Sequence, residues 1–140
     1  MPMDFNLFER TILMVTAGSR AYGIHTETSD VDVKGVCIPP LSTYFGLDSL
    51  HKFEQADGSS HIADLQPYLT LTADERAAIA QDKIEGTVYE VRKFIKLALD
   101  NNPNILDVLF CRDQDIRLRT HFGEMLREAR DLFISAKCRH

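Results

Sequence analysis

The chain has 140 residues, which suffices for one domain with a single core and is too short for two ordinary domains. Hydrophobic residues make up 44% and charged residues 26% of the sequence, a balance typical of a folded globular protein and not of a disordered chain. The net charge of -5 differs from the basic surplus of domains that bind nucleic acid mainly through its phosphates. No apolar run approaches the ~18 residues of a membrane span, so we expect no membrane contact.

The cysteines indicate a reducing compartment. Cys37, Cys111 and Cys138 are odd in number, widely spaced and without a Cys-x-x-Cys pair, which argues against a zinc ribbon and against a disulfide scaffold. The N-terminal residues 1–6 lack the basic and apolar regions of a secretory signal. We therefore expect a cytoplasmic protein.

Short helices and strands are expected to alternate in the first half of the chain. Residues 4–10 fit a short helix, and the continuous apolar run 11–17 fits a strand buried on both faces. Val31 and Val33 alternate with charged residues and indicate a second strand. Residues 41–47 are expected to form a short helix or turn.

The middle of the chain shows little periodicity. We interpret residues 55–83 as an insertion or mobile loop. Within it, Thr72 and Glu75 have the spacing of a helix-capping box, so one or two helical turns are expected to follow.

The second half is expected to be helical. An apolar stripe with helical spacing predicts a helix over residues 87–100. Asn104 is expected to cap a further turn that leads into the apolar run 105–110, and a last helix is expected over 120–133. Strands and helices interleave, so the fold class is α/β or α+β with a small sheet.

Two carboxylates carry the clearest chemical signal. In a strand, residues i and i+2 share a face, so Asp30 and Asp32 are expected side by side while Val31 and Val33 point into the core. Adjacent carboxylates repel each other unless a cation neutralises them. A hard divalent cation such as Mg²⁺ is the natural occupant, although such a pair is more often only a solvated face.

A candidate phosphate cradle precedes these carboxylates. Gly18-Ser19 follows the first expected strand, where a glycine lets a phosphate approach the backbone and a following helical turn would direct its N–H groups at the phosphate. Such a pair alone is usually a simple turn. Together with the paired carboxylates it indicates phosphoryl or nucleotidyl transfer.

The sequence resembles the polymerase-beta-like nucleotidyltransferases, in which a glycine followed by Gly or Ser precedes an Asp-hydrophobic-Asp pair by about this spacing. The fuller text resembles the RNA-ligase-associated (RlaP-like) predicted nucleotidyltransferases. The matching segments are Gly18-Ser-Arg-Ala-Tyr-Gly23, Ser29-Asp-Val-Asp-Val-Lys-Gly35, Tyr89-Glu-Val-Arg-Lys-Phe-Ile-Lys-Leu-Ala-Leu99 and Asn102-Pro-Asn-Ile-Leu-Asp-Val-Leu-Phe110.

The resemblance implies a small mixed β-sheet flanked by helices, with residues 1–140 forming a single nucleotidyltransferase domain. Members of that group run on well past residue 138, so we expect this chain to be the N-terminal portion of a longer architecture. The expected last helix then exposes an apolar surface through which the chain could form a homo-oligomer.

The resemblance also implies a third carboxylate on a neighbouring strand, which with Asp30 and Asp32 would hold two Mg²⁺ or Mn²⁺ ions. Glu85 is our candidate, although it could instead be a helix N-terminal residue, and Asp82 is the rival.

Phosphate contacts are implied as well. Gly18 and Ser19 would hold the nucleotide phosphates. Arg20 and Lys93 would assist, unless Arg20 forms a surface ion pair and Lys93 lies on a solvated helix face.

The leading hypothesis is a metal-dependent nucleotidyltransferase that moves a nucleoside monophosphate (NMP) from a nucleoside triphosphate (NTP) to an acceptor hydroxyl of an RNA end, a small molecule or a protein. One alternative is a catalytically weak or inactive module that binds NTP or RNA, which the acidic balance favours. Another is a protein-modifying nucleotidyltransferase of the toxin–antitoxin type.

Overall fold

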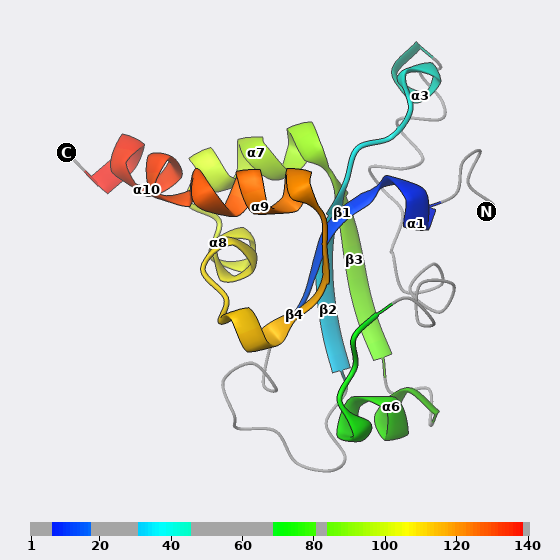
Figure 1. The fold of residues 1–140 in the computed structure, drawn as a ribbon. Helices are drawn as coiled ribbons and strands as arrows, with labels where there is room; N and C mark the ends of the chain where they lie inside the picture. Colours follow the sequence, from blue (N-terminus) through cyan, green and yellow to red (C-terminus); the bar gives the residue numbers. More distant parts are fainter. Residues whose placement is uncertain (1–6, 18–30, 46–68, 81–83, 139–140) are drawn as a thin grey trace.

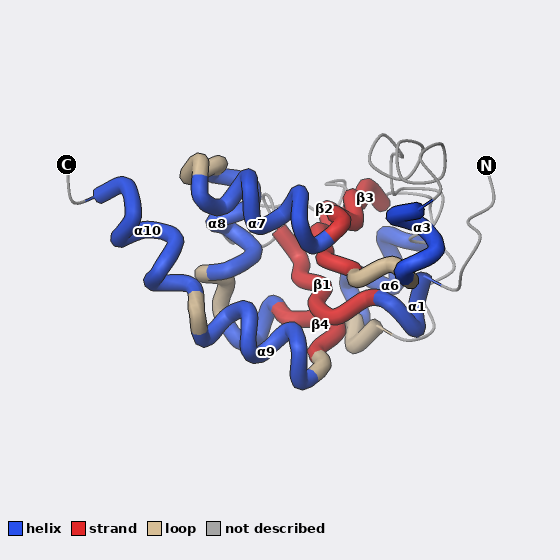
Figure 2. Tube along the Cα trace, turned by 90° about the horizontal axis from the view of Figure 1, so that it is seen from above, coloured by secondary structure: helices blue, strands red, loops and turns tan. Residues whose placement is uncertain are grey.

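The computed structural model describes residues 7–17, 31–45, 69–80 and 84–138, which form a four-stranded sheet with helices on both faces (Figures 1 and 2). The strands are β1 (Thr11–Ala17), β2 (Val31–Cys37), β3 (Ile84–Glu90) and β4 (Ile116–Arg119). Their order across the sheet is β3-β2-β1-β4. β1 is antiparallel to β2 and β4, whereas β2 and β3 are parallel. The mixed sheet flanked by helices confirms the expected fold class.

The helices divide between the two faces of the sheet. They are α1 (Leu7–Arg10), α3 (Leu41–Phe45), α6 (Ala73–Ala80), α7 (Val91–Leu99), α8 (Pro103–Leu109), α9 (His121–Glu128) and α10 (Arg130–Cys138). The last four lie on one side of the sheet, whereas α1 and α6 lie on the other (Figure 2). Within the described residues, no helix has the length and apolar character to span a membrane.

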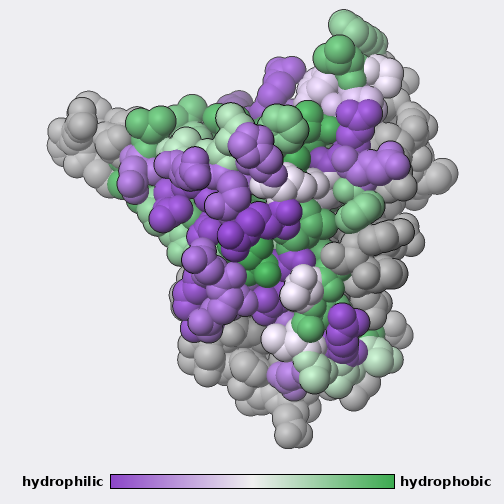
Figure 3. Space-filling view, in the orientation of Figure 1, coloured by the Kyte–Doolittle hydropathy of each residue, from purple (hydrophilic) through white to green (hydrophobic). Residues whose placement is uncertain are grey.

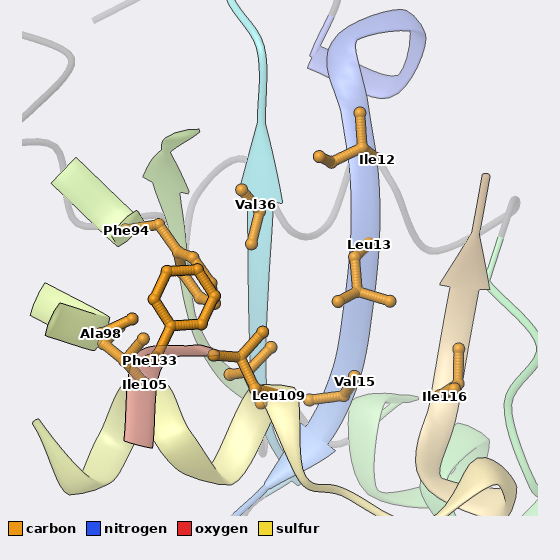
Figure 4. Packing of buried hydrophobic residues seen from close by; sticks show 11 residues of the cluster. Ile12, Leu13, Val15, Val36, Phe94, Ala98, Ile105, Leu109, Ile116 and Phe133 are labelled. Atoms are coloured by element: carbon orange, nitrogen blue, oxygen red, sulfur yellow. The ribbon is translucent and has the colours of Figure 1, made fainter. Parts of the chain in front are cut away.

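Each face of the sheet has its own core. On the side of α7–α10, Phe94, Leu109 and Phe133 pack towards Leu13 and Val36 of the sheet (Figure 4). The opposite core joins strand residues to the segment around α6 and is smaller. Its buried members include Met14, Val31, Val33, Leu71 and Ile79. Because β1 contributes to both cores, all seven of its residues are buried, as its continuous apolar sequence predicts.

A bulge in β1 fixes where α9 begins. The pairing of β1 with β2 shifts between Thr11 and Leu13, so Ile12 is the extra residue. The Ile12 carbonyl accepts hydrogen bonds from the Thr120 backbone N–H at 3.1 Å and from Thr120 Oγ1 at 2.9 Å. Thr120 Oγ1 also accepts from the Gly123 N–H at 3.2 Å and so caps α9. The bulge and the helix start are therefore joined through one threonine.

The helix expected over residues 87–100 is wrong in its first part, because β3 extends to Glu90 and α7 begins at Val91. The Glu90 carboxylate accepts hydrogen bonds from the Arg92 and Lys93 backbone N–H groups, both at 3.0 Å, and ends the strand by capping the helix. Val88 fits a helical stripe by spacing but is buried as a strand residue.

Two further expectations about the second half need correction. The single helix expected over 120–133 is two helices, because α9 ends at Glu128, with Ala129 as its C-cap, and α10 starts at Arg130. The cap of α8 is Asn102, whose side chain accepts from the Asn104 N–H at 3.0 Å, and not Asn104 itself. The four-residue strand β4 was not expected at all.

Part of the segment expected as an insertion or mobile loop belongs to the core. Residues 69–80 include α6, and Leu71 and Ile79 are buried against the sheet. The capping box is confirmed: the Glu75 N–H donates to Thr72 Oγ1 at 3.1 Å, and the Thr72 N–H donates to Glu75 Oε1 at 2.9 Å. Residues 55–68 and 81–83 lie outside the described residues.

Glu75 also ties α6 to the sheet through a buried network. Its carboxylate lies 2.8 Å from Arg117 Nε of β4 and accepts a hydrogen bond from Thr16 Oγ1 of β1 at 2.5 Å. Burial raises the pKa of the Glu75 carboxyl, but hydrogen bonds from Thr16 and Thr72 and the charge of Arg117 outweigh burial, so the pKa lies below its usual value. The ionised form is therefore the stable form in the folded protein.

The apolar surface expected on the last helix is divided between core and solvent. Phe133 is buried, whereas Phe122 is 59% and Leu132 is 70% exposed. A second exposed apolar group, Leu41 and Phe45, lies on α3, where hydrophobic side chains stand out at the top of Figure 3.

We expect Gly123→Ala to destabilise the protein although alanine favours helices. A Cβ at this position would lie 2.1 Å from the Ile12 carbonyl oxygen, so α9 would have to move away from β1. A loss of roughly 2–3 kcal/mol in the free energy of unfolding is expected in urea titrations. Glu128→Ala, on an exposed turn of the same helix, is the control and should change stability little. Wild-type stability in Gly123→Ala would contradict the docking of α9 on the bulge.

We expect Glu75→Gln to cost roughly 3 kcal/mol at pH 7, because Arg117 is left buried without its counter-charge. The stabilisation from the lowered pKa is fully present above the unfolded pKa of about 4.3 and is lost as the pH falls through the lower folded pKa. The difference in the free energy of unfolding between wild type and Glu75→Gln, measured by urea titration, should therefore become smaller below pH ~4. Glu128→Gln is the control. If the free energies of unfolding of wild type and Glu75→Gln changed in parallel with pH, the lowered pKa of Glu75 would not contribute to stability and the prediction would be wrong.

Candidate nucleotidyltransferase site

The candidate site lies at the end of the sheet where β2 and β3 begin and β1 ends. Asp32 on β2 pairs with Ala17, the last residue of β1, and with Glu85 on the parallel strand β3. Positions in register on neighbouring strands lie on the same face of a sheet. Asp32 and Glu85 therefore occupy adjacent positions on one face, and the residue before Gly18 occupies the third.

The face that Asp32 occupies is the one covered by α7–α10. In β2, Val31 and Val33 belong to the core on the α6 side, whereas Val36 belongs to the core on the other side. The alternation of a strand then places Asp32 and Lys34 on the face of Val36. Their side chains are 33% and 14% exposed, so both lie at the margin of that core and not in open solvent.

Lys34 is a charged neighbour of Asp32. Its Nζ lies 3.9 Å from Asp32 Oδ2. Burial raises the pKa of the Asp32 carboxyl, and the positive charge of Lys34 lowers it by less, so the net pKa is above the usual value. The Asp32 carboxyl is therefore protonated more readily than that of an exposed aspartate.

Lys34 is fixed by a second contact from the helical layer. Its ammonium donates a hydrogen bond to Asn104 Oδ1 at 3.2 Å, and Asn104 lies in the first turn of α8. Lys34 was not among the predicted site residues. The available signal was its position two residues after Asp32 in an alternating strand, which places both on one face.

Tyr89 extends the same face along β3. It pairs in register with Val36, two positions beyond the pairing of Lys34 with Thr87. Burial raises the pKa of the Tyr89 hydroxyl, and the negative charge of Asp32 raises it further. The phenol therefore stays protonated at neutral pH and lies within the electrostatic range of Asp32.

The predicted phosphate ligand Lys93 lies elsewhere. It is in the first turn of α7, which follows the far end of β3. At ~3.3 Å per residue, this turn begins roughly 20 Å along the strand from Glu85. The structure does not bring Lys93 and Asp32 together at one end of the sheet.

The other predicted site residues lie outside the described part of the chain. They are Gly18, Ser19, Arg20, Asp30 and Asp82. Among the residues that are described, no three His, Cys, Asp or Glu side chains gather as a set of metal ligands. The donor that is described, the half-buried Asp32 carboxylate, has the oxygen chemistry that Mg²⁺ and Mn²⁺ prefer, and Glu85 would supply the same chemistry.

The register of β2 and β3 can be tested by cross-linking. In-register residues of neighbouring strands lie ~5 Å apart, within the Cα separation that a disulfide bridges. We expect Asp32→Cys with Glu85→Cys to form a disulfide under mild oxidation, detected by mass spectrometry of peptides. The matched control, Asp32→Cys with Thr87→Cys, is displaced by two residues and should not cross-link. Equal yields in the two variants would contradict the register.

The chain is similar to a known protein family and to a phage protein. No solved structure matches the chain. The chain is 26% identical over 101 residues to an uncharacterized 38.9 kDa protein of the nrdC-mobD intergenic region of Enterobacteria phage T4. This alignment covers 71% of the chain and 25% of the phage protein, so the chain spans about a quarter of that relative's length. Residues 5–140 match the RNA repair pathway DNA polymerase beta family (RlaP). The chain therefore belongs to this family and is a polymerase-beta-like, nucleotidyltransferase-like protein.

Proposed function

We propose that the chain is a metal-dependent nucleotidyltransferase that moves an NMP from an NTP to an acceptor hydroxyl. The observation that carries the proposal is the pairing of Asp32 with Glu85 on the parallel strand β3, next to the residue that precedes Gly18. Two carboxylates in register suit a divalent cation, and a glycine at that point of the chain suits a phosphate. Family membership supports the same class of reaction.

The proposed reaction is one in-line displacement. The acceptor oxygen forms a bond to the α-phosphorus, the bond from that phosphorus to the oxygen bridging to the β-phosphorus breaks, and pyrophosphate leaves with its electrons. The acceptor proton passes to solvent. Two Mg²⁺ or Mn²⁺ ions, when bound, supply charge neutralisation and a lower pKa of the acceptor hydroxyl. We find no need for a covalent intermediate on the protein.

The chain's own residues divide this work. Asp30, Asp32 and Glu85 would hold the metal ions, and Gly18 and Ser19, with Arg20, would bind the phosphates. Lys93 has no support for a phosphate role in the described residues, because it lies at the other end of β3. Tyr89 lies on the same face as Asp32 and would separate the site from the apolar core.

An RNA end is the acceptor that we favour, because the family is named for an RNA repair pathway. The acidic net charge of -5 suggests that RNA is not held by this chain through a broad basic surface. Contacts to a longer RNA would then come from elsewhere in an assembly. We further propose a cytoplasmic location, and self-association through the exposed apolar residues of α9 and α10.

The test uses the full chain with each α-³²P-labelled NTP, Mg²⁺ or Mn²⁺, and RNA with defined ends. We expect label transfer to RNA and release of unlabelled pyrophosphate. Asp32→Asn and Glu85→Gln should each reduce transfer at least ~100-fold, because each would remove a metal ligand. Glu128→Gln and Asp131→Asn, on exposed parts of α9 and α10, are the matched controls.

Three outcomes separate the hypotheses. Transfer that survives Asp32→Asn contradicts the assigned metal site. NTP and metal binding without transfer to any acceptor supports the alternative of a binding module. Label on protein and not on RNA identifies a protein acceptor.

A further inference from the structure

We propose that Lys34 is the internal counter-cation of the metal site: it neutralises Asp32 when no metal is bound and sets how tightly the site binds a divalent cation. This inference rests on the proposed function and extends it to a residue that neither the sequence motifs nor the family comparison assigns. Lys34 is on this account a positioning residue that acts through Asp32.

The geometry of β2 holds Lys34 next to Asp32. Lys34 follows Asp32 by two residues in the same strand, and its Nζ lies 3.9 Å from Asp32 Oδ2. A strand fixes the directions of both side chains, so the two charges remain neighbours without depending on a flexible loop. A cation that binds Asp32 must therefore approach a carboxylate that already faces an ammonium.

The Lys34 ammonium lies in a mostly buried, paired environment. Lysine side chains are rarely buried unless they are paired, yet the Lys34 side chain is only 14% exposed. The hydrogen bond to Asn104 Oδ1, at 3.2 Å, holds the ammonium between β2 and the first turn of α8. Lys96 on α7, by contrast, is exposed.

The charge of Asp32 is only partly balanced. Lys34 Nζ lies 3.9 Å from Asp32 Oδ2, at the long end of an ion pair, and the Asp32 side chain is still 33% exposed, so Lys34 neutralises the carboxylate only in part. An ion pair that fully neutralised the carboxylate would leave little electrostatic gain for a metal ion. Partial neutralisation stabilises the Asp32 carboxylate in the metal-free protein and still leaves enough negative charge to attract a divalent cation.

The consequence is competition between two cations for one carboxylate. A divalent ion bound at Asp32 would lie within a few ångströms of the Lys34 ammonium, where like charges repel even in partly exposed surroundings. Removing the charge of Lys34 should therefore strengthen metal binding. A role of Lys34 in packing alone would weaken metal binding or leave it unchanged.

The experiment measures Mn²⁺ binding to the nucleotide-free full chain by electron paramagnetic resonance of the free ion. The variants are Lys34→Gln, which keeps a donor for Asn104, and Lys34→Met, which does not; Lys96→Met is the matched control. We expect both Lys34 variants to bind Mn²⁺ roughly three- to ten-fold more tightly than wild type, on the scale of a single partly exposed charge. Lys96→Met should bind with wild-type affinity.

A second measurement does not depend on metal. In the metal-free protein, Lys34→Gln should lower the melting temperature by about 2 °C when Asp32 is present, because a half-buried carboxylate loses its counter-charge. In the Asp32→Asn background the same change should have little effect. An equal loss in both backgrounds would show that Lys34 acts through packing and would overturn the inference.

The outcomes distinguish the counter-cation role of Lys34 from the proposed function. If wild type binds no Mn²⁺ up to millimolar concentration, both the metal site and the counter-cation role are wrong. If wild type binds Mn²⁺ and the Lys34 variants bind it equally or more weakly, the counter-cation role is wrong and the proposed function stands.

Discussion

The rest of the structure depends on the burial of β1. This strand forms hydrogen bonds with β2 on one edge and β4 on the other, and both of its faces are covered. A strand held in this way cannot shift its register without exposing a complete row of apolar side chains. Its last residue is thereby fixed opposite Asp32, so the position of the candidate site follows from the packing of an apolar strand that carries no chemistry.

The two faces of the sheet then serve different ends. On one face, the buried ion pair of Glu75 and Arg117 holds α6 against β4, so both an ion pair and apolar contacts stabilise the packing there. On the other face, the core of α7–α10 gives way to polar residues towards Asp32. Reduced exposure to water strengthens electrostatic interactions, which suits a site that must hold cations and phosphates.

The sequence allowed β1, β2 and the capping box of α6 to be predicted because each depends on local signals: a continuous apolar run, alternation over residues 31–34 and a four-residue motif. β3 could not be predicted in this way. Its Val88 continues the helical stripe of α7, and the boundary is set by Glu90, a residue type that seldom caps helices. Strand β4 has only four residues and is stabilised by hydrogen bonds to the edge of β1, a tertiary contact that the local sequence does not indicate.

The candidate site shows the same division. Asp32 was recognisable from alternation, and Glu85 from family resemblance, but their register could only come from the folded sheet. Lys34 belongs to the recognised motif, but its contact with Asn104 could not be predicted because the two residues are 70 positions apart in the sequence.

The alternation of residues 31–34 in β2 has a consequence for changes in chain length. Deleting or inserting one residue between Asp32 and Val36 would place the residues on one side of the change on the opposite face, so that either the two charged residues or the apolar ones would meet the wrong environment. Changes of two residues keep the faces and alter only the length of the strand. In a library of length variants of this segment, odd and even changes should therefore fall into separate classes of tolerance. Homologous chains should therefore rarely carry an insertion or deletion of one residue in this segment.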